Sequence, residues 1–240
     1  MADSNDDFGS THWSVIHAAA QSASPQAREA MARLCAAYWY PLYAYLRRHP
    51  MTREQADDLT QEFFAQQFVT GKVLQGLDAS RGRFRAWLLE SLKNLVKNEH
   101  DRKTALKRGG VSPHLPLDFF DCAESRYLQE ASSALSAEQL YEQAWVMTLL
   151  LKVRGQLRDK YVGADNAQRF DLLSAFLPGA GGGSQADAAA KLGLDANAVK
   201  QAVFRLRRDF GEALRAELTR TVPPDDVDEE LKHLMEVCSW

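Results

Sequence analysis

Basic residues interleaved with aromatic and amide side chains occur in two separate stretches of the chain. Between Arg81 and Arg108, nine Lys and Arg residues are opposed by only three acids, and six more basic residues lie between Lys200 and Arg220. Such side chains neutralise phosphates, stack on unpaired bases and form hydrogen bonds with base edges. The chemistry indicated is non-covalent recognition of a polyanion, although charge alone fits two solvated helix faces equally well.

Residue patterns that carry covalent catalysis are not found in the sequence. The six histidines are scattered without metal-ligand spacing, and Gly179–Gly183 is not followed by the Lys-Ser/Thr pair of a phosphate-binding loop. Three cysteines far apart (Cys35, Cys122 and Cys238) indicate neither a disulfide framework nor a zinc site. We therefore expect no enzyme, no catalytic residue, no metal and no cofactor.

The elements that must position these basic residues are helical. The chain has 240 residues, of which 45% are hydrophobic and 25% charged, as in ordinary globular proteins. Almost every periodic stretch has helical spacing, and no convincing alternating strand is found. We expect an all-α fold of two helical domains joined by an irregular linker, with these bounds: a first domain over 1–108, an acidic linker over 109–137, a second domain over 138–220 and an acidic amphipathic extension over 221–240.

The stretch from Ser184 to Phe210 has the spacing of a helix-turn-helix. Ser184 and Asp195 are suitable N-caps for two successive helices, and Gly193 lies between them where a left-handed backbone is wanted. In a DNA-reading motif of this kind the second helix enters the major groove. With its apolar residues facing inward, that helix presents the side chains predicted to contact DNA, namely Asn197, Lys200, Gln201, Phe204, Arg205 and Arg208. An ordinary helical hairpin is the alternative.

Two helices of the first domain carry faces of opposite character. Thr52 and Gln55 can form a capping box for a helix with an acidic and polar face. The next helix, expected over about Phe84–Arg108, combines basic residues with aromatic and amide side chains that suit single-stranded or partly melted nucleic acid. The alternative is that Phe84 and Trp87 simply belong to the core.

In this order, the motifs resemble those of a bacterial RNA polymerase sigma factor of the extracytoplasmic-function type. Asp57–Phe64 resembles the region-two helix that docks on the polymerase clamp, and Phe84–Asn98 resembles the helix that melts the promoter. The loop Lys72–Arg83 matches the loop that captures a flipped base, and Ala186–Arg208 resembles region four, which reads the distal promoter element. Three shorter motifs, Tyr38–Tyr43, Asp58–Phe64 and Leu106–Gly110, resemble more narrowly a subgroup often associated with Ser/Thr kinases.

The resemblance implies a partner for each motif. Core RNA polymerase would be bound by Asp57, Asp58, Gln61 and Glu62. The proximal promoter element would be bound by Arg81, Arg83, Phe84, Arg85, Trp87, Lys93, Asn94, Lys97, Asn98 and Arg102. The distal element would be read by the helix-turn-helix residues given above. The expected function is promoter recognition and strand opening in transcription initiation, without a covalent step.

Two features suggest regulation of such a factor. Thr60 lies where many relatives carry an aliphatic residue, and in kinase-linked relatives a threonine of this helix is phosphorylated. A phosphate on Thr60 would add negative charge beside Asp58 and Glu62. A Ser/Thr kinase or an anti-sigma protein is therefore a candidate partner. The extension from Val222 to Trp240 carries six acids against one lysine. Its apolar stripe (Leu231, Leu234, Met235 and Val237) could hold it over the DNA-binding face or merely dock the terminus.

Two other classes of protein fit parts of the pattern. A conventional helix-turn-helix regulator would bind duplex DNA tightly by itself, and a helical protein-interaction adaptor would show no salt-sensitive affinity for DNA. The longest apolar run, Trp145–Leu151, is far shorter than the roughly 18–20 residues that a membrane span needs. The acidic start of the chain also differs from a secretory signal. We expect a cytoplasmic protein that does not insert into membranes.

Overall fold

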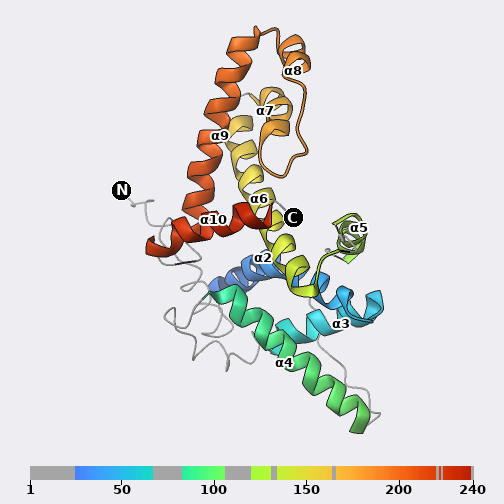
Figure 1. Ribbon diagram of the computed structural model, residues 1–240. Coiled ribbons are helices and arrows are strands. Elements are labelled where there is room, and N and C mark those ends of the chain that lie inside the picture. Colours follow the sequence, from blue (N-terminus) through green and yellow to red (C-terminus); the bar gives the residue numbers. More distant parts are fainter. Residues whose placement is uncertain are drawn as a thin grey trace. The chain divides into compact units, whose positions relative to one another are not determined.

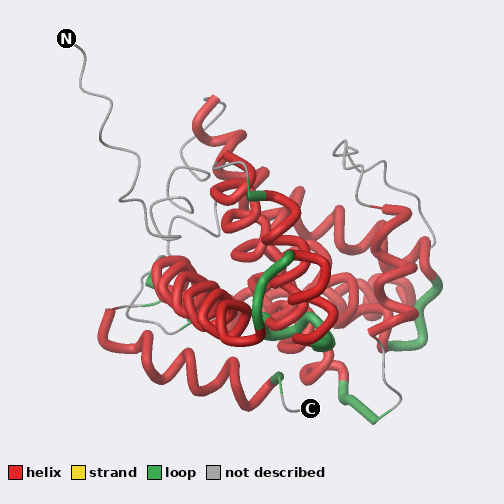
Figure 2. The backbone as a smooth tube through the Cα atoms, turned by 90° about the horizontal axis from the view of Figure 1, so that it is seen from above, coloured by secondary structure: helices red, strands yellow, loops and turns green. Residues whose placement is uncertain are grey.

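The computed structural model describes residues 25–66, 83–105, 120–130, 134–163, 166–219, 222 and 224–238. Within these ranges every regular element is a helix, and Figure 2 shows no strand among them. The predicted all-α fold is confirmed for this part of the chain. None of the described helices combines the length and the apolar character that a membrane crossing requires.

The chain divides into two compact units. The first unit comprises 1–145 together with 220–223, and the second comprises 146–219 together with 224–240. The boundary between the units falls inside helix α6 (Ala137–Gly163).

The first unit is built around an aromatic helix. This helix, α2, spans Pro25–Arg48 and continues through Pro41, and its residues from Tyr38 to Leu46 are buried. A proline cannot donate a backbone hydrogen bond, yet the residues on both sides of Pro41 are helical and buried. Besides the first turns of α6, the other helices in the described part of this unit are α3 (Arg53–Phe64), α4 (Phe84–Ala105) and α5 (Phe120–Glu130) (Figure 1).

The N-terminus of α3 is capped as the sequence predicts. The Thr52 hydroxyl accepts a hydrogen bond from the Gln55 amide at 3.2 Å, and the Gln55 side chain accepts one from the Thr52 amide at 3.1 Å. The cap therefore fixes where α3 begins and which of its faces is buried against α2.

Helix α5 lies within the segment where the sequence predicted an irregular linker. Its Glu124 pairs with Arg47 of α2 at 2.8 Å and also accepts a hydrogen bond from the Tyr43 hydroxyl. The Arg126 guanidinium lies over the Tyr40 ring, 3.8 Å from its centre. These partners come from α2, some 80 residues earlier in the chain, so the local sequence gives no signal of them. For residues 120–130, the prediction of irregular structure is wrong.

The second unit contains the helix-turn-helix. It consists of the rest of α6, α7 (Ala167–Leu173), the 3₁₀ turn η4 (Ser174–Phe176), α8 (Gln185–Leu192), α9 (Ala196–Leu218), η5 (Pro224–Asp226) and α10 (Val227–Val237). Helices α7 and α8 pack on α9, as Figure 1 shows. An ion pair between Lys152 and the buried carboxylate of Glu217 joins α6 to α9.

Candidate nucleic-acid interface

The turn between α8 and α9 has the geometry that the sequence predicts. Ser184 accepts a hydrogen bond from the Asp187 amide at 3.2 Å, and Asp195 accepts one from the Ala198 amide at 2.8 Å. Gly193 ends α8 with a φ of 63°, in the left-handed region that favours glycine. Two caps and one glycine thus set the angle at which α9 leaves the turn.

One face of α9 is buried and the other is open to solvent. The buried face contains Val199, Ala202, Val203, Leu206 and Phe210. All six residues predicted to contact the distal promoter element are exposed: Asn197, Lys200, Gln201, Phe204, Arg205 and Arg208. The structure therefore brings the predicted residues together on one accessible surface, which we call the α9 face.

The α9 face combines positive charge with an exposed aromatic ring. Lys200 and Arg205 form no ion pair with any residue of the described part of the chain, whereas Arg208 lies 3.2 Å from Asp209 and 3.6 Å from Glu212. Phe204 is 70% exposed between these cations. Exposing the apolar surface of a phenyl ring to water is unfavourable in free energy. Contact with the methyl group of thymine is one way to remove that surface from water.

Several residues of α4 that were predicted to contact DNA are not accessible to solvent. Phe84 is buried and stacks on Trp87, with the ring centres 5.6 Å apart. Arg85 is also buried, and its Nε atom donates to the Glu142 carboxylate at 3.0 Å while its guanidinium lies over the ring of Trp145. These contacts belong to the core of the first unit, so Phe84 and Arg85 are not available to nucleic acid in this conformation.

The other predicted residues of α4 differ in accessibility. Lys93 is half-buried between Glu90 at 2.9 Å and Glu138 at 3.3 Å. Asn94, Lys97 and Asn98 are exposed at helical spacing and share one face of α4. Arg83 and Trp87 are half-buried. Arg81, the rest of residues 72–82, which were predicted to form a loop, and the side chain of Arg102 lie outside the described residues.

The predicted polymerase-binding residues of α3 also differ in how accessible they are to solvent. Asp58 is exposed, and the half-buried Glu62 accepts a hydrogen bond from Gln66 at 2.7 Å. Gln61 is buried. Asp58 and Glu62 lie one turn apart, so they form an acidic pair on the accessible side of α3.

Asp57 points toward the interior of the first unit. Its Oδ1 atom is buried without a hydrogen-bond partner, and its Oδ2 atom lies 3.9 Å from the guanidinium of Arg53. Burial raises the pKa of Asp57 to about 6, and the negative charges of Asp58 and Glu124 act in the same direction against the opposing effect of Arg53.

Thr60 is completely buried. Its hydroxyl donates to the Ala56 carbonyl at 2.7 Å within α3, and its side chain has no accessible surface. A kinase could reach this hydroxyl only after α3 had opened locally, so the folded conformation does not favour Thr60 as a phosphorylation site.

The C-terminal extension does not cover the α9 face. In α10, Val227, Leu234 and Val237 are buried, Leu231 is half-buried and Met235 is 73% exposed. Arg215 pairs with Asp228 of α10 at 2.8 Å, which attaches the extension near the C-terminal end of α9. The predicted recognition residues remain exposed with α10 in place.

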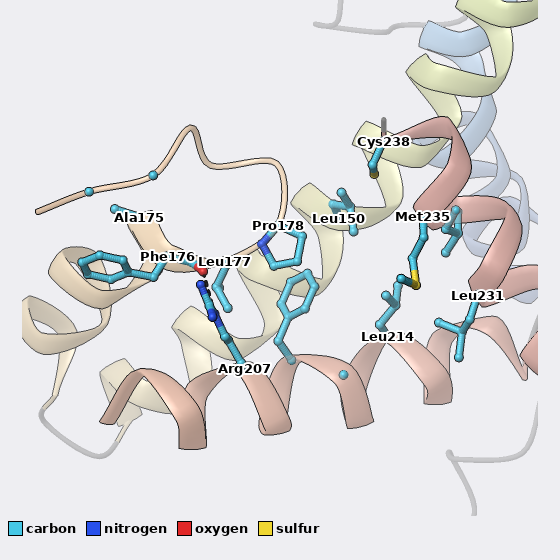
Figure 3. Close-up of a pocket in the computed structure, with 15 residues that line it drawn as sticks. Leu150, Ala175, Phe176, Leu177, Pro178, Arg207, Leu214, Leu231, Met235 and Cys238 are labelled. Carbon is cyan, nitrogen blue, oxygen red and sulfur yellow. Dashed lines mark hydrogen bonds between the residues drawn. The ribbon is translucent and has the colours of Figure 1, made fainter. Parts of the chain in front are cut away.

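A cavity next to α10 was not predicted from the sequence. It has a volume of about 730 Å³ and is lined by apolar residues of α6, α9, α10 and the segment 175–183, with Arg207 as the one charged lining residue (Figure 3). The basic character of Arg207 was visible in the sequence, but its place beside an apolar cavity was not.

The described residues contain no cluster of His, Cys, Asp or Glu that could hold a metal ion. In comparisons with known proteins, no family model, no curated protein and no solved structure matches the chain. Function must therefore be argued from the residues and their geometry.

Proposed function

We propose that this protein is a promoter-specificity subunit of bacterial RNA polymerase, similar to extracytoplasmic-function sigma factors. The observation that carries the proposal is the α9 face, where cationic, amide and aromatic side chains are exposed together on the second helix of a helix-turn-helix. These are the side-chain types that read base edges in the major groove and neutralise phosphates.

The first unit supplies two further surfaces for this function. The acidic pair Asp58 and Glu62 would contact a basic surface of core polymerase. Asn94, Lys97 and Asn98 of α4 would contact the melted proximal element, because lysine neutralises phosphate and amides form hydrogen bonds with unpaired bases. The protein performs no covalent step. Binding energy spent on the unpaired strand lowers the free energy of strand opening.

The test is capture of purified bacterial core RNA polymerase by the chain. The wild type is expected to bind stoichiometrically, and Asp58→Lys/Glu62→Lys is expected to bind poorly, because two repulsive charges replace two attractive ones. Asp159→Lys/Asp225→Lys is the matched control, since it makes the same charge change at two exposed acids outside α3. Equal binding by all three proteins would refute the assignment of the α3 surface.

The other classes of protein give different results in the same preparation. A conventional regulator would not bind polymerase but would bind its duplex site tightly, with an affinity that falls steeply with salt. A protein-interaction adaptor would show neither polymerase binding nor salt-sensitive DNA binding. In either case the sigma-factor proposal fails.

A further inference from the structure

The cavity beside α10 is large enough for a small molecule and is almost entirely apolar. Its volume of about 730 Å³ lies within the range of roughly 300–1,000 Å³ found for ligand pockets. Leu150 of α6, Phe210 and Leu214 of α9 and Leu231 and Leu234 of α10 contribute to its walls. Since these side chains come from three helices, an occupant would contact α6, α9 and the C-terminal extension at the same time.

The polar character of the cavity is concentrated in Arg207. Its Nε atom donates to the Phe176 carbonyl at 3.0 Å, which holds the guanidinium against one wall (Figure 3). No acid of the described residues pairs with Arg207, whereas the neighbouring Arg208 and Arg215 both have carboxylate partners. The terminal nitrogens of Arg207 are therefore available to an anion from outside the chain.

The opposite part of the cavity carries no charge. Figure 3 shows Met235 and Leu231 on the α10 side, well apart from Arg207. Burial raises the pKa of the Cys238 thiol above its ordinary value, so this lining group is neutral at pH 7. Met235 is 73% exposed at the rim. An occupant that covers these side chains would remove apolar surface from water.

We propose that this cavity binds a free long-chain carboxylate, with its carboxylate group on Arg207 and its alkyl chain along Leu214, Leu231 and Met235. One cation at one side of an otherwise apolar cavity matches a ligand with one anionic end and an apolar body. The bound chain bridges α9 and α10, so binding also stabilises the docked extension. This proposal does not depend on the sigma-factor assignment.

The experiment follows displacement of a dansyl-labelled undecanoic acid from the full-length protein. Dodecanoic acid, kept below its critical micelle concentration, is expected to displace the probe about tenfold more effectively than dodecanol, because only the acid forms a charge-assisted hydrogen bond with Arg207. Arg207→Gln is expected to abolish this preference. Arg158→Gln is the control, since it removes one exposed positive charge of the second unit away from the cavity.

A second pair of variants tests the position of the site. Gly211 lines the cavity, and a Cβ atom added to it meets nothing within 4 Å, so Gly211→Leu is chosen to place a side chain at this wall. We expect this variant to lose probe binding while melting no lower than the unliganded wild type, because leucine favours the helix more than glycine does. Gly155→Leu makes the same change at an open helical position outside the cavity and is expected to bind normally.

Four results would overturn the proposal. These are the absence of saturable probe binding, equal displacement by acid and alcohol, unchanged binding by Gly211→Leu, and flotation of the protein with anionic phospholipid vesicles. The last result would identify the apolar rim as a membrane contact rather than a site for a free carboxylate.

Discussion

The Nε atom of Arg85 lies 3.0 Å from a carboxylate oxygen of Glu142, and this ion pair joins α4 to the first turns of α6. The Tyr141 hydroxyl donates to the Arg85 carbonyl at 2.9 Å, and the ring of Trp145 lies 4.4 Å from the guanidinium. An arginine from the most basic stretch of the sequence is thus a structural residue of the first unit.

Arg85→Ala is therefore expected to affect stability first. Removing Arg85 takes away the cation that the half-buried Glu142 carboxylate pairs with and the group that covers the Trp145 ring, at a cost of about 3 kcal/mol. Urea denaturation measures this loss. Lys97→Ala, at an exposed position of α4, should change the free energy of unfolding by less than about 0.5 kcal/mol. It should instead weaken binding to single-stranded DNA. An Arg85→Ala protein as stable as the wild type would contradict the structural role.

Thr60→Glu should unfold α3 rather than activate the protein. The side chain at this position is completely buried, and placing a carboxylate there without a partner costs about 3 kcal/mol or more. Chemical denaturation of the variant measures the cost, with Asp58→Glu as a control at an exposed position of the same helix. Unchanged stability together with stronger polymerase binding would restore Thr60 as a phosphorylation site.

Phe204 is expected to read a thymine methyl group. Once a duplex site has been obtained by in vitro selection, replacing a contacted thymine by uracil should weaken wild-type binding about fourfold, the value of one buried methyl group. Phe204→Ala should bind both duplexes equally, as measured by fluorescence anisotropy. Gln201→Ala should bind more weakly but keep the preference for thymine. A wild type that never discriminates uracil from thymine would exclude this contact.

Asp57→Asn should stabilise the protein in a pH-dependent way. The pKa of Asp57 is raised from 3.8 to about 6 by burial, so the folded state favours the protonated carboxyl and loses stability as the pH rises through 6. Because Asp57 is partly solvated, we expect Asn to gain only about 1 kcal/mol at pH 7.5. The gain should shrink as the pH falls from 6 toward 4 and vanish near pH 3, where folded and unfolded states both hold the proton. Melting temperatures from pH 3 to 8 test this, and a constant difference would contradict it.

Leu234→Ala should loosen α10 without exposing a DNA-binding surface. Leu234 is buried, and truncation of a buried leucine costs about 2–5 kcal/mol when its surroundings cannot collapse. The recognition residues of α9 are already exposed with α10 docked, so duplex affinity should stay the same. Deletion of 227–240 tests the same point, and a gain in DNA affinity in either protein would support autoinhibition by the extension.

The helix-turn-helix could be predicted in detail because its determinants are local. Ser184, Gly193 and Asp195 act on backbone groups within a few residues of themselves, and helical periodicity separates the buried Val199 from the exposed Lys200. The capping box at Thr52 is local in the same sense. Such features depend on hydrogen bonds and spacing that can be read directly from consecutive residues.

The tertiary structure alone decided which basic residues remain available. Arg85 and Arg207 both lie in basic stretches, but Glu142, 57 residues away, buries the first in an ion pair. The second lies against a carbonyl 31 residues earlier and beside an apolar cavity, with no acid of the described chain as its partner. A charge in the sequence specifies what a residue can bind. Distant packing decides whether that capacity is used inside the fold or left for a ligand.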